Sequence, residues 1–119
     1  MASAAFELVK QHGPLAIIPI NAPAVFMEEF FMASLTIALF HFFPNPKAEM
    51  GVLYFTSALF ALTHGPVVGW MPINFLYLFI LRMFINWAWR ISKTLWGAVL
   101  FHFVWNSLLF LLAYYQIRI

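Results

Sequence analysis

The sequence contains no cysteine, which excludes disulfide bonds and thiolate metal ligands. Charged residues are also scarce, at 8% of the 119 residues against about 25% in a typical soluble domain. The net charge of +2 is small and scattered, so no nucleic-acid-binding surface is expected. The chain is instead strongly apolar, since 65% of its residues are hydrophobic and its mean hydropathy is +0.90. This composition predicts an integral membrane protein.

The apolar residues form long runs without period-two alternation. Such runs indicate helices, because the strands of a membrane β-barrel alternate between lipid-facing and interior residues. Each helical span needs about 20 apolar residues, so the chain has room for about four. We therefore predict an all-α, multi-pass membrane protein, a compact bundle of about four transmembrane helices. Residues 1–10 lack a basic start before an apolar core, so no removable signal peptide is expected.

Prolines and short polar stretches divide the chain. Four residues interrupt the apolar stretch near the N-terminus: Gly13, Pro14, Pro19 and Pro23. We therefore predict an irregular, interfacial N-terminal segment over residues 1–22 and a membrane domain over residues 23–119. Gly65-Pro66 should loosen the second span just after His64. The predicted spans cover residues 23–43, 51–68, 72–89 and 94–117.

Basic residues are distributed unequally between the two sides of this predicted bundle. The loops after the first and third spans hold Lys47, Arg90 and Lys93, whereas the opposite side holds Lys10 and Arg118. Because short cytoplasmic loops carry an excess of Lys and Arg, this count favours the first side as cytoplasmic.

Two adjacent glutamates, Glu28 and Glu29, lie inside the first predicted span. A carboxylate at membrane depth costs about 2.5–3.5 kcal/mol on insertion scales. An ionisable residue there indicates a functional site unless a structural partner explains it. The pair is therefore the first candidate site.

Further polar residues occur in the other spans at helical spacing. Phe60 and His64 lie four residues apart in the second span, and His102 and Asn106 lie four apart in the fourth, so each pair shares a helix face. At about 1.5 Å per residue, counted from the loops at Pro44 and Lys93, Glu28, His64 and Asn106 lie at a depth of roughly 20 Å, and His102 lies at roughly 14 Å. We expect these four side chains to face a common interior.

Three segments in this order resemble the motifs of a known family. Residues 28–33 read Glu-Glu-Phe-Phe-Met-Ala, residues 60–64 read Phe-Ala-Leu-Thr-His, and residues 102–106 read His-Phe-Val-Trp-Asn. Their order and spacing resemble the Glu-Glu-x-x-x-Arg, Phe-x-x-x-His and His-x-x-x-Asn motifs of the CAAX protease and bacteriocin-processing family of intramembrane proteases. The resemblance covers about residues 23–112, essentially the core domain of that family.

The resemblance implies a role for each motif residue. Glu28 would activate a water molecule as general base, with Glu29 as its second carboxylate. His64 would assist proton transfer or position the water, and His102 with Asn106 would stabilise the developing oxyanion. Fixed donors at such a position contribute about 2.7–4 kcal/mol each. The substrate implied is a membrane-tethered peptide.

The chain departs from the family at Ala33, where the first motif has arginine. Arg82, near the middle of the third span, lies roughly 12 Å from one face of the membrane. Residue 33 lies roughly 15 Å from that face. A lone guanidinium in a membrane is costly, and so are two neighbouring carboxylates, so pairing would offset both. We predict an ion pair between Arg82 and Glu29 that leaves Glu28 to the site.

The sequence leaves alternatives open. The missing arginine and the short chain also suit a non-catalytic descendant, a small subunit that packs with other membrane-protein subunits and lipids. A third reading makes His64 or His102 an axial ligand of haem or chlorophyll. No cofactor is predicted for the protease, although Glu28, His64 and His102 could together bind zinc.

Overall fold

The computed structural model describes residues 4–115, which are helical apart from short connections and contain no strand. Arg118 and the last two residues of the predicted fourth span, 116 and 117, lie outside this range. The elements are α1 (Ala4–His12), a 3₁₀ turn η1 (Pro14–Ala16), α2 (Ile17–Phe42), a second 3₁₀ turn η2 (Pro46–Ala48), α3 (Glu49–Thr63), α4 (Gly65–Val68), α5 (Pro72–Ser92) and α6 (Leu95–Tyr114).

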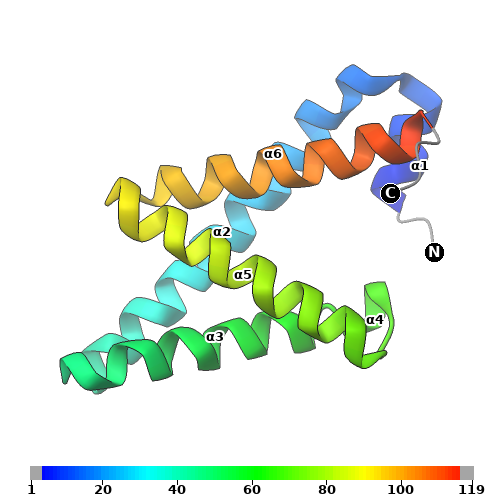
Figure 1. Ribbon diagram of the computed structural model, residues 1–119. Coiled ribbons are helices and arrows are strands. Elements are labelled where there is room, and N and C mark those ends of the chain that lie inside the picture. The colour runs from blue at the N-terminus through cyan, green and yellow to red at the C-terminus, as the bar shows by residue number, and fades with distance from the viewer. Residues whose placement is uncertain (1–3, 116–119) are drawn as a thin grey trace.

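Four long helices form the body of the molecule (Figure 1). Helix α2 packs against α3 and α6, and α5 packs against the same two helices. The connections α2–α3 and α5–α6 lie at one end of the molecule, whereas α1 and the C-terminal end of α6 lie at the other (Figure 1). Long helices that follow one another in the chain are therefore antiparallel. Residues at equal distance from the end that carries the α2–α3 and α5–α6 connections lie at about the same level.

Within the part of the chain that the structure describes, two helical stretches are long and apolar enough to cross a bilayer, Pro14–Phe42 and Leu95–Tyr114. The all-helical prediction is confirmed for the described residues.

The prediction of an irregular chain before residue 22 is wrong, because α2 already begins at Ile17. Pro19 lies in the first turn, where backbone N–H groups have no helical partner and proline costs little. Pro23 lies inside the helix and removes one backbone hydrogen bond, but α2 continues through it to Phe42. The prolines therefore lie within the helix instead of delaying its start.

Helix α3 ends where the Gly65-Pro66 pair predicted a break. Residue His64 separates α3 from the short helix α4, with backbone angles of −91° and −4°. A Cβ at Gly65 would overlap the Trp70 ring, so a larger residue there would require this exposed indole to move. The break places the His64 side chain at the end of α3, whose earlier residues pack in the core.

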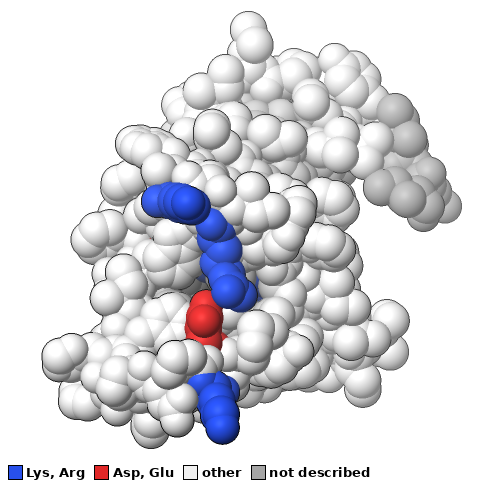
Figure 2. Space-filling model, turned by 60° about the vertical axis from the view of Figure 1, so that its left-hand side comes forward, with Lys and Arg blue, Asp and Glu red and all other residues white. Residues whose placement is uncertain are grey.

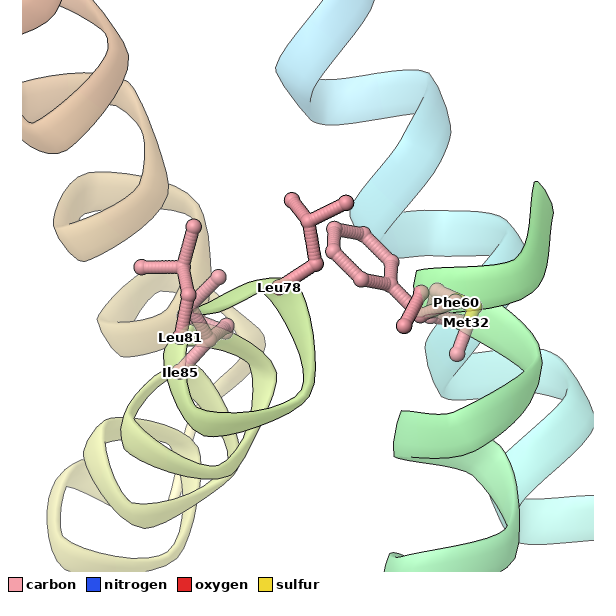
Figure 3. Close-up of a cluster of buried hydrophobic side chains, with 7 residues drawn as sticks. Met32, Phe60, Leu78, Leu81 and Ile85 are labelled. Carbon is pink, nitrogen blue, oxygen red and sulfur yellow. The ribbon is translucent and has the colours of Figure 1, made fainter. Parts of the chain in front are cut away.

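The apolar core lies between α2, α3, α5 and α6 and includes five residues labelled in Figure 3: Met32, Phe60, Leu78, Leu81 and Ile85. All five are less than one tenth exposed. In Figure 3 the Phe60 ring and the Leu78 side chain lie toward one another, from α3 and α5 respectively. Because Phe60 also belongs to the second motif, the core directly supports the candidate site.

Gly97 permits the close approach of α6 to the end of α5. A Cβ at this position would lie 1.9 Å from Oγ of Ser92 and 2.8 Å from the carbonyl oxygen of Ala88. We expect Gly97→Ala to destabilise the fold by about 1–3 kcal/mol, because the α5–α6 turn must open. Gly51 of α3 has open space around it, so Gly51→Ala is the matched control and should stabilise by at most about 1 kcal/mol. Thermal unfolding in detergent compares them, and equal shifts would contradict this packing.

Candidate active site

A fully buried charge cluster joins α2, α5 and α6. The guanidinium of Arg82 donates through Nη1 to Oε2 of Glu29, and Nδ1 of His102 lies 2.9 Å from the same oxygen. The three side chains are 1%, 0% and 3% exposed, respectively. A carboxylate paired with a guanidinium is an acceptor, so Nδ1 of His102 carries the proton and donates. The cluster thus fixes the His102 ring and leaves its Nε2 for another partner.

A second pair, Glu28 and His64, lies at the edge of this cluster and is more open. Nε2 of His64 lies 3.0 Å from Oε1 of Glu28, and the two side chains are 28% and 31% exposed. The contact has the distance of an ion pair, but Oε1 receives no well-aligned hydrogen bond. A small rotation of either side chain would align the N–H of His64 with Oε1 of Glu28.

The proton of His64 can be assigned from its other contact. Nδ1 lies 2.7 Å from the carbonyl oxygen of Phe60, which can only accept, so Nδ1 carries a hydrogen. If Nε2 and the carboxyl of Glu28 were both unprotonated, two lone pairs would face each other at 3.0 Å. The His64–Glu28 pair therefore holds one further proton between its members. A pair that holds one exchangeable proton is suited to general acid–base chemistry.

The Phe60 ring contacts both the buried charge cluster and the His64–Glu28 pair. Its ring centroid lies 4.3 Å from that of His64 and 6.2 Å from that of His102. The Arg82 guanidinium lies over the same ring, 5.3 Å from its centroid, within the range of a cation–π contact. The Phe60 ring therefore packs between the buried cluster and the more open pair.

Asn106 lies apart from these contacts. Its Nδ2 is 3.5 Å from Oδ1 of Asn21, a weak contact between α6 and α2. Asn21 is buried and donates to Oγ of Ser107 at 3.2 Å and to the carbonyl oxygen of Phe103 at 3.4 Å. The structure thus brings the four predicted residues to neighbouring turns of three helices, but it does not place Asn106 in contact with the glutamates or histidines.

Sequence reasoning did not identify Asn21, because it lay in the segment predicted to be irregular. The signal was nevertheless present. Asn21 precedes Glu28 by seven residues, about two helical turns, so the two lie on nearly the same face once α2 is extended to Ile17.

Besides Oε1 of Glu28, which faces Nε2 of His64, two buried polar atoms at the centre of the site have no hydrogen-bond partner among the described residues: Oε1 of Glu29 and Nε of Arg82. Buried polar groups are normally satisfied by protein or by ordered water. These two atoms supply one acceptor and one donor, a set that a bound water or a peptide group could satisfy.

The side chains do not fit a zinc site. Within residues 4–115, no group of three or more His, Asp or Glu side chains is arranged to hold a metal ion. The carboxylate that contacts His102 also receives Arg82, whose positive charge opposes a metal at that position.

An all-helical domain with this arrangement of motifs has an intramembrane protease-type fold. The chain belongs to the Rce1-like family, since the family model described as type II CAAX prenyl endopeptidase Rce1-like matches residues 10–108. This match confirms the resemblance to CAAX-processing proteases and places the chain in a membrane-embedded family. No curated protein and no solved structure was found to match the chain.

Proposed function

We propose that the chain is an intramembrane endopeptidase of the CAAX-processing type in which Glu28 activates a water molecule. The observation that carries this proposal is the contrast between two adjacent carboxylates. Glu29 is enclosed and neutralised by Arg82, whereas Glu28 is about one third exposed and faces only an imidazole. Two carboxylates in unlike surroundings can take different roles, one structural and one chemical.

In the proposed reaction, water attacks the carbonyl carbon of the scissile peptide bond while Glu28 accepts one of its protons. The carbonyl oxygen becomes an oxyanion in the tetrahedral intermediate. When the carbon–nitrogen bond breaks, the leaving amine takes a proton from the Glu28–His64 pair. One water is consumed, and the pair returns to its starting protonation state.

The oxyanion needs donors, and we assign that role to Nε2 of His102 and Nδ2 of Asn106. In this scheme both ring nitrogens of His102 donate, Nδ1 to Glu29 and Nε2 to the oxyanion. Asn21 accepts one Nδ2 hydrogen of Asn106, which leaves the second hydrogen for the substrate. Glu29 and Arg82 act in this scheme as positioning residues, since they hold the His102 ring and do not touch the reacting atoms.

We further propose a multi-pass membrane protein in which α2, α3, α5 and α6 all cross the bilayer. Support comes from the two long apolar helices and from the packing of α3 and α5 against them. The substrate would be a membrane-tethered peptide carrying a prenylated cysteine, the class named in the family description. The chain would meet such a substrate within the lipid phase.

The experiment is a cleavage assay in liposomes prepared in ¹⁸O-labelled water. The purified chain is mixed with a prenylated, membrane-tethered peptide, and the products are analysed by mass spectrometry. We expect a released C-terminal fragment and one ¹⁸O atom in the new carboxylate. Absence of any fragment, from protein whose helical content is intact, would reject the protease and favour the non-catalytic membrane-subunit alternative.

A further inference from the structure

A cavity of about 430 Å³ opens between α3 and α5, away from the candidate active site. Its apolar wall is formed by Met50, Leu53, Met83, Trp87 and Ile91. It lies toward the end of the molecule that carries the α2–α3 and α5–α6 connections, because it reaches Met50 at the start of α3 and Ile91 at the end of α5.

Two polar side chains also line this cavity, Asn86 and Arg90. Asn86 is 1% exposed and donates to Oγ of Ser57 at 3.3 Å, but its Oδ1 has no partner among the described residues. A buried acceptor without a partner is uncommon in a folded protein. A ligand with a hydroxyl or ammonium donor would satisfy it.

Arg90, in the last turn of α5, provides positive charge in the lining of the cavity. Its Nη2 lies 2.9 Å from Oε1 of Glu49, and both side chains are about half exposed. Lys47 and Lys93 are exposed in the adjoining connections, so basic residues outnumber acidic ones at this end. Figure 2 shows this face as a column of basic atoms, with acidic atoms between them, on an otherwise uncharged surface.

We propose that this cavity binds an anionic phospholipid, with the phosphate on Arg90 and an acyl chain along the apolar wall. An amphiphile fits better than a soluble anion because the cavity combines an apolar wall with the charged Arg90 and the polar Asn86. A headgroup hydroxyl, as in phosphatidylglycerol, would supply the donor for Asn86. The inference rests on the proposed membrane location but not on proteolysis. Basic residues beside a bilayer attract anionic lipids in this way.

The test uses the purified chain in phosphatidylcholine nanodiscs containing a minor fraction of phosphatidylglycerol. Native mass spectrometry measures how much phosphatidylglycerol the released protein retains. We expect Arg90→Gln to weaken retention about five-fold, the effect of one cation at an anionic surface. Glu49→Gln should strengthen retention, because it removes the carboxylate that competes for Arg90. Met50→Trp should weaken it without any change in charge, because the larger ring fills the cavity.

Lys10→Gln, at the opposite end of the molecule, is the control for the loss of one positive charge and should change retention less than two-fold. The opposite signs expected for Arg90→Gln and Glu49→Gln distinguish lipid binding from a salt bridge that only stabilises the fold, which would make both changes harmful. Equal effects of these two, or an unaltered Met50→Trp variant, would overturn the proposal. Displacement of the lipid by millimolar inorganic phosphate would also overturn it in favour of a soluble anion site. Cleavage in pure phosphatidylcholine is measured separately, so loss of the lipid site leaves the proposed protease testable.

Discussion

Glu28→Gln is expected to reduce peptide cleavage by at least about 100-fold while leaving the helical content unchanged. The amide is nearly the same size as the carboxyl group but cannot accept a proton from water. Because Glu28 is one of the more exposed polar residues of the site, its replacement leaves no unpaired buried charge. His64→Gln should give a similar loss, since it removes the partner that holds the shared proton. Initial rates with the prenylated, membrane-tethered peptide measure both effects.

Glu49→Gln is the matched control for this result. Glu49 makes a surface ion pair with Arg90 at the loop end of the molecule, so its loss should leave cleavage within about two-fold of wild type. If the Glu28 and Glu49 variants cleaved equally well, Glu28 would not be the base. Cleavage that survived both Glu28→Gln and His64→Gln would remove the proposed mechanism altogether.

The second large effect concerns the buried pair of Arg82 and Glu29. Removing one partner leaves an uncompensated charge in an apolar interior, so Arg82→Met or Glu29→Gln alone should cost about 3–5 kcal/mol. The double variant should cost less than the sum of the single variants, because neither charge remains. Unfolding of the purified chain in mixed micelles with increasing denaturing detergent measures this cycle.

Strictly additive losses would show that the two side chains do not depend on each other. His102 adds a second readout, because Nδ1 of this residue donates to the same carboxylate oxygen. Its imidazole NMR signals should move in the Glu29→Gln variant and much less in Gly51→Ala, which changes a surface position of α3. A His102 signal that did not respond would separate the histidine from the ion pair.

The sequence was informative about the depth of polar residues in this fold. Helical rise is nearly constant, so counting from the loops placed Arg82 near the depth of residue 33, about one turn from Glu29, and in the structure Arg82 contacts Glu29. The Gly65-Pro66 pair likewise marked the end of α3, since no helix passes through both residues without loosening.

The direction in which side chains face was less predictable. Asn106 lies on the turn that follows His102, yet it contacts Asn21 rather than the histidines, because helix packing decides which neighbour each side chain meets. Pro19 was expected to interrupt the helix and Pro23 to begin it, whereas α2 begins at Ile17, with Pro19 in its first turn and Pro23 in its interior. As a result, the segment that contains Asn21 was predicted to be irregular, and Asn21 was not identified as a site residue.

The ion pair between Arg82 and Glu29 also has a consequence for biosynthesis. Its members are 53 residues apart in the chain and lie on different helices. At translation rates of about 5–20 residues per second, Glu29 would leave the ribosome roughly 3–10 seconds before Arg82 does. During that interval Glu29 has no guanidinium partner. In the proposed multi-pass arrangement the ion pair would form only after α5 has been synthesised, so full insertion of α2 into lipid would be favoured once both helices are present.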